Sequence, residues 1–201
     1  MGPNASQLGG FYAVVDAIGG RADPCATAVQ LRLKDAPTAV LLAEAKRLRG
    51  EVRDALLIVN DRVDVALAAG ADGVHLGQTD LPLADARRIA QGLVIGISTH
   101  DLDQVAAAVE GGADYLGYGP VFATTTKEAP DPVQGVDALA AAVAAAAPVP
   151  VVAIGGITPA RAAEVAATGC AAACVIASVN LAADPAAAAR AIAAAFSGAR
   201  T

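Results

Sequence analysis

Two aspartates that could bind a metal ion lie at the ends of two successive apolar runs. The run 55–59 stops at the polar pair Asn60 and Asp61, and the run 73–76 stops shortly before Asp80. A short helical pattern separates the two runs, so the stretch reads as strand, helix, strand. In a parallel sheet with a right-handed crossover, both strand ends lie on the same edge, which would bring the carboxylates together. Two carboxylates beside the side-chain amide of Asn60 predict a binding site for a hard cation. Such an ion would keep open coordination positions for a phosphorylated substrate.

A second set of polar residues alternates along the apolar run 27–33. Gln30, Arg32 and Lys34 are two positions apart, so they share one face of a strand. Strands of a parallel sheet are usually apolar throughout, and a polar face is hard to explain by packing. We predict that this face contributes to the functional site.

Two further segments have compositions that suit anionic oxygen atoms. The tetrad Thr124-Thr-Thr-Lys127 lies in the long loop 119–132 and offers hydroxyls, backbone amides and one cation. Gly155-Gly156 follows a strand and precedes a helix, where backbone amides can approach a phosphate. A solvated loop and a plain turn are the alternatives. We expect His75 to be a packed strand residue, whereas His100 fits either a loop or the site.

These residues can meet only if the apolar runs are arranged in one sheet. We place strands at 11–15, 27–33, 55–59, 73–76, 93–97, 115–118, 149–154 and 172–177. Eight strands alternating with helices predict an α/β fold, a (β/α)8 TIM barrel, whose chemistry gathers at the carboxyl ends of the strands. A doubly wound sheet is the alternative. We expect a single barrel domain over 1–201, with 1–10 as a flexible N-terminal segment.

Two local features bear on the expected barrel. Similar segments occur at 70–72 (Gly-Ala-Asp) and 112–114 (Gly-Ala-Asp), with a decayed copy at 169–171. In each, the glycine would end a helix before the chain enters a strand. The segment between the first two strands is at the lower limit for a helical crossover. We therefore predict that the first crossover helix is shortened or missing and that one side of the barrel is thinly covered.

The composition narrows the class of protein. The 201 residues carry a formal net charge of −6, with 55% hydrophobic residues. This balance argues against a nucleic-acid partner, which would call for a basic patch. Cys170 and Cys174 fall in an apolar run and are expected to be buried thiols. No secretory signal or uninterrupted apolar run of about 18 residues is present, so we expect no membrane partner and a cytoplasmic location.

In combination and in this order, the motifs resemble those of the thiamine phosphate synthase family. The matching segments are Gln30-Leu-Arg-Leu-Lys34, Asn60-Asp61-Arg62, Val74-His-Leu-Gly-Gln-Thr-Asp80, Ile97-Ser-Thr-His100, Gly119-Pro120, Thr124-Thr-Thr-Lys127 and Gly155-Gly-Ile157. The resemblance implies a Mg2+-dependent transferase. Its phosphorylated small-molecule substrates would be 4-amino-2-methyl-5-hydroxymethylpyrimidine diphosphate and a thiazole phosphate carboxylate, and diphosphate would be released.

The resemblance also implies a role for each matched residue. The metal ligands would be Asp61 and Asp80. The catalytic groups would be Arg32, Lys34, Ser98 and Lys127. The pyrimidine diphosphate would be held by Gln30, Arg32, Lys34, Asn60, Ser98 and Lys127. The thiazole phosphate would be held by Thr124, Thr126, Gly155, Ile176 and Ala177. In a dissociative displacement, the metal and the cations would stabilise the charge that develops on the leaving diphosphate.

Three departures from the family pattern stand out. Leu33 occupies a position that is glutamate in the family motif, and its side chain should point away from the site. Ile176-Ala177 stands where the second phosphate segment usually reads Val-Ser, with Ser178 one place later. The first helix is missing together with the glycine-rich turn that normally precedes the second strand.

Other functions and an oligomer are also compatible with the sequence. A thiazole tautomerase-like enzyme shares the barrel but handles no diphosphate. A degenerate barrel would bind phosphorylated ligands without turnover. The apolar flank left by the missing helix would suit a homodimer.

Overall fold

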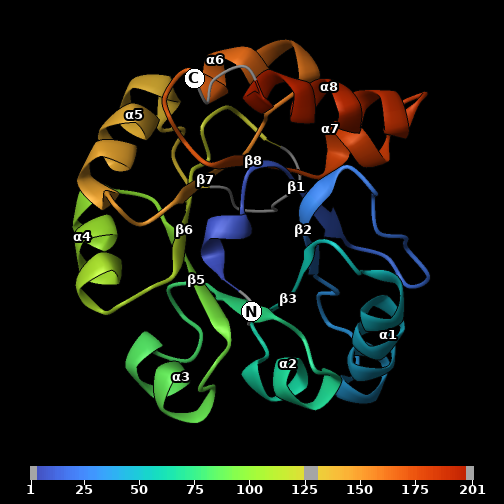
Figure 1. The fold of residues 1–201 in the computed structure, drawn as a ribbon. Helices are drawn as coiled ribbons and strands as arrows, with labels where there is room; N and C mark the ends of the chain where they lie inside the picture. The colour runs from blue at the N-terminus through green and yellow to red at the C-terminus, as the bar shows by residue number, and fades with distance from the viewer. Residues whose placement is uncertain (1–3, 125–130, 198–201) are drawn as a thin grey trace.

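The computed structural model describes residues 4–124 and 131–197 and shows a closed barrel of eight parallel strands (Figure 1). The strands are β1 (Gly10–Val15), β2 (Ala26–Leu31), β3 (Leu56–Asn60), β4 (Gly73–Leu76), β5 (Val94–Thr99), β6 (Tyr115–Tyr118), β7 (Val151–Ile154) and β8 (Ala172–Val175). Each strand pairs with its neighbour in sequence, and β8 closes onto β1. The predicted (β/α)8 barrel is confirmed, and the doubly wound alternative is wrong.

A ring of helices surrounds the barrel. They are α1 (Thr38–Glu51), α2 (Val63–Ala69), α3 (Leu83–Ile89), α4 (Leu102–Glu110), α5 (Gly135–Ala146), α6 (Ala162–Ala166) and α8 (Pro185–Ser197), with a 3-10 turn η2 (Pro159–Arg161) before α6. A short helix, α7 (Ala177–Asn180), follows β8 and replaces the end of the strand predicted over 172–177. None of the helices in the described parts of the chain is long and apolar enough to cross a membrane.

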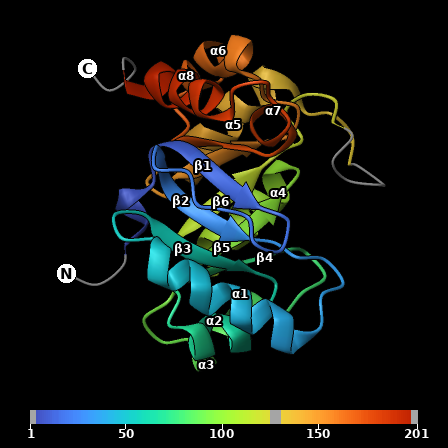
Figure 2. The ribbon, with the colours of Figure 1, turned by 90° about the vertical axis from the view of Figure 1, so that its right-hand side faces the viewer.

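The first crossover contains no helix, as the sequence predicts. Between β1 and β2 the chain follows bends and turns from Asp16 to Cys25. Figure 2 shows β1 and β2 facing the viewer between α8 above and α1 below, with no helix across them. Ala22 and Cys25 cover part of this side by packing against the core, while Ile18 is 68% exposed.

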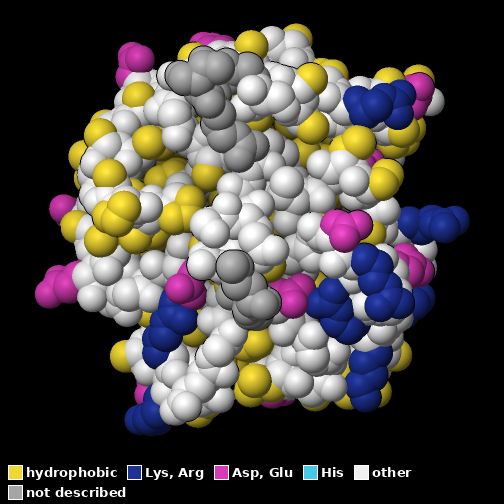
Figure 3. Space-filling model, in the orientation of Figure 1, with side chains coloured by type: hydrophobic (Ala, Val, Ile, Leu, Met, Phe, Trp, Pro, Cys, Tyr) yellow, Lys and Arg dark blue, Asp and Glu magenta, His cyan; other side chains and the backbone are white. Residues whose placement is uncertain are grey.

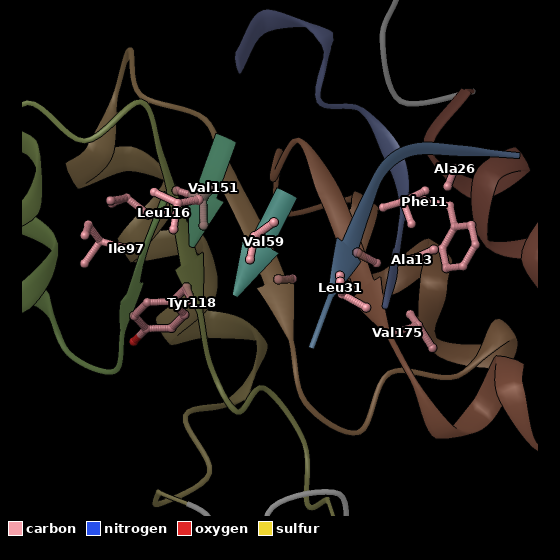
Figure 4. Close-up of a cluster of buried hydrophobic side chains, with 14 of the residues drawn as sticks. Phe11, Ala13, Ala26, Leu31, Val59, Ile97, Leu116, Tyr118, Val151 and Val175 are labelled. Carbon is pink, nitrogen blue, oxygen red and sulfur yellow. The ribbon is translucent and has the colours of Figure 1, made fainter. Parts of the chain in front are cut away.

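Successive side chains along each strand point alternately outward and inward, so the buried side chains form two layers. Residues such as Phe11, Leu31 and Val175 point outward and pack under the helices (Figure 4). Inward-facing residues such as Tyr12 and Tyr115 fill the barrel interior. Cys170 and Cys174 are buried, as the sequence predicts.

The N-terminal segment, expected to be flexible over 1–10, packs against the barrel where the structure describes it. Its described part forms a 3-10 turn, η1 (Ala5–Gln7), which is capped by Asn4 and leads into β1. Ala5 and Leu8 are buried against the interior cluster at the amino-terminal ends of the strands. In Figure 1 this dark blue segment lies over the middle of the barrel. The segment is packed because its two apolar side chains close that end of the barrel.

The three repeated segments form the same backbone joint. Gly70, Gly112 and Gly169 have φ angles of 65°, 78° and 82°, the left-handed conformation that ends a helix. Two residues later, a backbone amide donates to the preceding strand: Asp72 to Leu57 at 2.9 Å, Asp114 to Ile95 at 2.9 Å, and Ala171 to Val151 at 2.7 Å. The decayed third copy therefore keeps the backbone bond and lacks only the carboxylate.

The carboxylate of the second copy stabilises the barrel at this joint. Asp114 Oδ2 accepts from the buried amide of Ile95 at 2.7 Å and pairs with Arg87. We expect Asp114→Ala to cost about 1–3 kcal/mol of unfolding free energy, because the Ile95 amide loses its acceptor. Asp114→Asn keeps an acceptor oxygen and loses only a partly exposed ion pair, at about 0–1 kcal/mol. Denaturant unfolding measures both variants, and equal losses would assign the effect to the ion pair.

The charged side chains do not form one uniform face. Figure 3 shows basic side chains grouped on the side of α1 with acidic ones between them, and a more hydrophobic surface over α4 and α5.

Candidate functional site

A cavity of about 590 Å³ lies at the carboxyl ends of the strands, a volume typical of small-molecule sites. Every predicted site residue that the structure describes lines it: Gln30, Arg32, Lys34, Asn60, Asp61, Asp80, Ser98, Thr124, Gly155, Ile176 and Ala177. Thr126 and Lys127 lie outside the described residues. Barrel closure thus gathers side chains from segments that are far apart in the sequence.

The two aspartates lie on the same rim and close together. Asp61 directly follows β3 and has a φ of 62°, a left-handed conformation that Asp and Asn tolerate better than most residues. Its amide donates to the carbonyl of His75 at 2.8 Å. Asp80 Oδ2 accepts from the amide of Gly77 at 2.7 Å. The two carboxyl groups are within hydrogen-bonding reach of each other.

Burial and the neighbouring carboxyl group of Asp80 change the acidity of Asp61. Burial raises the pKa of Asp61 to about 6, and the hydrogen bond with Asp80 and its charge add to this increase. The positive charges of Arg32 and Lys34 act in the opposite direction. A divalent cation between the carboxylates would remove the repulsion that favours the protonated form.

This pair of carboxylates fits a magnesium site that is completed by other ligands. Mg2+ is usually bound through one or two carboxylates, water and substrate phosphates. Within the described residues, no group of three or more His, Cys, Asp and Glu side chains gathers as a closed metal cage. Asp61 and Asp80 would therefore hold the ion and leave positions for phosphate oxygens.

Arg32 and Lys34 lie beyond the end of β2, which stops at Leu31 and not at residue 33 as predicted. The amide of Arg32 still donates to the carbonyl of Val15 at 2.9 Å, so the backbone runs on beside β1. No carboxylate of the described residues lies within 4.0 Å of either cationic group. Both cations line the cavity, where they could contact an anionic ligand.

A chain of hydrogen bonds crosses the interior below the carboxylates. Gln30 Nε2 donates to the Tyr12 hydroxyl at 3.0 Å, and the hydroxyls of Tyr12 and Tyr115 are 2.9 Å apart. The Tyr115 hydroxyl is 3.0 Å from His75 Nδ1, and His75 Nε2 is 2.9 Å from Ser98 Oγ. Neither tyrosine is singled out by the sequence pattern. His75 lies on a strand, as the sequence predicts, and its ring also faces the cavity.

Burial determines the protonation states in this chain. Desolvation raises the pKa of both Tyr12 and Tyr115. It lowers the pKa of His75 to about 4, although the negative charge of Asp80 opposes the decrease. At neutral pH both phenols are therefore protonated and the imidazole is neutral.

The opposite wall is a backbone surface formed by two loops. Gly155 and Gly156 have φ angles of 96° and 63°, and a Cβ on Gly156 would lie 2.4 Å from the carbonyl oxygen of Ala123. The amide of Phe122 donates to the carbonyl of Gly155 at 3.0 Å. Only glycine permits this close approach, which leaves backbone groups of the turn facing the cavity.

Two other residues on this wall were not assigned a role from the sequence. Arg161 lines the cavity, stacks on Phe122 at 4.4 Å and donates to the carbonyl of Gly156 at 3.0 Å. The hydroxyl of Ser178 donates to the carbonyl of Ile157 at 2.7 Å and so ties α7 to the glycine turn.

The other residues singled out in the sequence have clear positions. Leu33 packs against the outer core, on the side away from the cavity, as predicted. His100 lines the cavity, with Nδ1 2.6 Å from the carbonyl oxygen of Gly119 and Nε2 3.5 Å from Asp131.

Comparisons with known proteins agree on one family. Residues 11–179 match the family model described as thiamine monophosphate synthase. A thiamine-phosphate synthase of Anaeromyxobacter dehalogenans is 47% identical, over 97% of this chain and 91% of its own. Another, from Chloroflexus aurantiacus, is 51% identical over 82% of this chain and 77% of its own. The solved thiamine phosphate pyrophosphorylase of Pyrococcus furiosus superimposes with a TM-score of 0.87 at 38% identity, covering 98% and 99% of the two chains.

Proposed function

Because the chain belongs to the thiamine monophosphate synthase family, we propose that its cavity joins hydroxymethylpyrimidine diphosphate to thiazole phosphate carboxylate with the aid of Mg2+. Its activity is that of a thiamine-phosphate synthase, a transferase. The observation that carries the proposed chemistry is the pair of neighbouring carboxylates in one cavity with two cations that have no carboxylate of the described residues within 4.0 Å.

The reaction breaks the bond between the pyrimidine methylene carbon and a diphosphate oxygen. The electron pair leaves with the diphosphate, and negative charge grows there as the bond breaks. Arg32 and Lys34, which line the cavity, would stabilise this charge, with Lys127 as a third cation expected from the sequence. Mg2+ on Asp61 and Asp80 would supply Lewis-acid stabilisation of the same charge.

The second substrate would bind on the backbone wall. Amides of the turn at Gly155 and of the segment 176–177 can hold its phosphate, with the Thr124 hydroxyl beside them. The thiazole nitrogen then forms the new bond to the methylene carbon. This nitrogen carries no proton, so no side chain has to act as general base for that step. Formation of thiamine phosphate also breaks the bond between the thiazole ring and its carboxylate. CO2 leaves, and the electron pair left on the ring carbon takes up a proton from water.

Diphosphate release tests this function directly. The purified chain should release diphosphate with both substrates and Mg2+, and chelation of the metal should stop the reaction. A thiazole tautomerase-like enzyme would release none. A degenerate barrel would bind the pyrimidine diphosphate in calorimetry and also release none, and either result would reject the proposal.

The raised pKa of Asp61 predicts a pH dependence of metal binding. Activity at limiting Mg2+ should fall as the pH drops through about 6, because protons compete with the cation for Asp61. Measuring the apparent Mg2+ affinity between pH 5 and 8, a range of about three units around that pKa, tests this. An affinity that does not change with pH would contradict the prediction.

The metal-free protein should show the opposite trend in stability. The pKa of Asp61 is higher in the folded state than the unfolded value of about 3.9. Its contribution to stability is therefore fully present below about pH 4 and is lost as the pH rises through about 6. Thermal melts of the metal-free wild type should show this loss, and Asp61→Asn should not.

A further inference from the structure

The hydrogen-bonded chain inside the barrel joins two residues that face the substrate cavity. Gln30 and Ser98 are its ends, and Tyr12, Tyr115 and His75 connect them. The five side chains come from β2, β1, β6, β4 and β5, so the chain spans most of the barrel interior. Tyr12 and Tyr115 are buried and His75 is half-buried, and the proposed reaction itself uses none of these three polar groups.

The barrel is shaped to hold the two central rings. A Cβ on Gly96 would lie 2.1 Å from Cζ of Tyr115, and a Cβ on Gly117 would lie 3.1 Å from Cε1 of His75. The rings of Tyr115 and His75 are in contact, with centroids 5.4 Å apart. The two glycines therefore leave space that only these rings fill.

The donor at one end determines the direction of every bond in the chain. The amide nitrogen of Gln30 can only donate, so the oxygen of Tyr12 accepts. The single proton of Tyr12 then goes to Tyr115, since the reverse arrangement would leave that proton buried without an acceptor.

The same direction continues from Tyr115 to Ser98. Tyr115 donates to Nδ1 of His75, which leaves the proton of the neutral imidazole on Nε2. Nε2–H donates to Ser98 Oγ, and the proton of the Ser98 hydroxyl is left to point into the cavity. At the other end, the Oε1 atom of Gln30 remains as an acceptor.

We propose that Tyr12, Tyr115 and His75 are positioning residues that fix Ser98 as a donor and Gln30 as an acceptor toward the substrate. The complementary ligand is a planar ring that offers an amino group to Gln30 and a lone pair to Ser98. This inference rests on the proposed function, because an aminopyrimidine is such a ring. The three positioning residues act through Ser98 and Gln30 and need not touch the substrate.

The tautomer of His75 tests the inference without any activity measurement. The polypeptide has only two histidines, so long-range 15N NMR can resolve both rings. We expect His75 to be neutral with its proton on Nε2, and a proton on Nδ1 would overturn the inference. In Tyr115→Phe the Nδ1 atom loses its donor, and the preference for the Nε2–H tautomer should weaken.

A double-mutant cycle tests whether Tyr115 acts through Ser98. Tyr115→Phe should raise the KM for the pyrimidine diphosphate by about tenfold, the effect of one lost hydrogen bond, with a smaller change in kcat. In a Ser98→Ala background the same change should have little further effect. Tyr118→Phe is the matched control, because Tyr118 is buried on the outer side of the same strand and does not line the cavity.

The outcomes separate this inference from the proposed function. Additive effects of Tyr115→Phe and Ser98→Ala, or an equal effect of Tyr118→Phe, would overturn the inference even if the enzyme is active. If the wild-type protein releases no diphosphate, the proposed function is rejected. The tautomer of His75 would still decide whether the hydrogen bonds run in the inferred direction.

Discussion

Asp61→Asn is expected to lower kcat by about 10³-fold or more while leaving the melting temperature of the metal-free protein unchanged or higher. The substitution removes one of two carboxylates that would hold Mg2+ against the diphosphate. It also removes the repulsion between Asp61 and Asp80, which adds to the effect of burial in raising the pKa of Asp61. Steady-state diphosphate release and thermal melts, each with and without Mg2+, measure the two effects.

Asparagine is the informative replacement because of the backbone at this position. Asp61 has a φ of 62°, which asparagine adopts readily and alanine does not. Asp61→Ala would therefore mix backbone strain with the loss of a ligand. Asp35→Asn is a matched control, since Asp35 has a φ of 59° and does not line the cavity.

The effect of Mg2+ on stability distinguishes a ligand from a structural residue. Excess Mg2+ should raise the melting temperature of the wild type and of Asp35→Asn, since an ion that binds only the folded state stabilises it. It should have much less effect on Asp61→Asn. If Asp61→Asn instead melts far below the wild type without metal, Asp61 is a structural residue and the proposed metal site is wrong.

The parts of the site that could be predicted are those set by local chain order. Asp61 and Asp80 each follow an apolar run, and parallel strands deliver such residues to one rim whatever lies between them. Gln30 was visible as a polar residue on an apolar strand. The missing first helix was visible because the segment after β1 is too short to hold it.

The parts that could not be predicted depend on contacts between distant segments. Tyr12 and Tyr115 stand in apolar runs where an aromatic residue normally reads as core, and their hydroxyls meet across 103 positions in the sequence. Arg161 follows Thr158-Pro159, a pattern that predicts only the start of a helix. Its contact with Phe122 forms only when the two loops fold together. The burial of Ala5 and Leu8 could not be predicted, because they lie in a short polar segment without periodicity. In the folded chain their side chains close one end of the barrel.

Arg32→Gln is expected to lower kcat by about 10²–10³-fold and to change the free energy of unfolding little. Removal of one preorganised group that stabilises transition-state charge typically has an effect of this size. Arg32 faces the cavity and no carboxylate of the described residues lies within 4.0 Å of its guanidinium group, so its removal breaks no ion pair. Single-turnover diphosphate release at saturating Mg2+ measures the effect on the chemical step.

Two companion variants define what Arg32 contributes. Arg32→Lys keeps the positive charge and loses the planar fork, so it should recover only part of the rate. Arg53→Gln makes the same change on an exposed residue just before β3, at the amino-terminal end of the barrel, and should leave kcat unchanged. Equal losses in Arg32→Gln and Arg53→Gln would mean that overall charge, and not the placement of Arg32, controls the rate.

Arg32 should also control the pH at which the metal site forms. Its positive charge lowers the pKa of Asp61, so Arg32→Gln should raise that pKa further. The fall in apparent Mg2+ affinity on acidification should therefore begin at a higher pH in Arg32→Gln than in the wild type. Arg32→Lys should stay close to the wild type in this respect, because the lysine keeps the charge. The kcat of Arg32→Gln could fall without any shift in its pH profile. In that case Arg32 acts on the substrate alone, and its charge does not influence the carboxylates of Asp61 and Asp80.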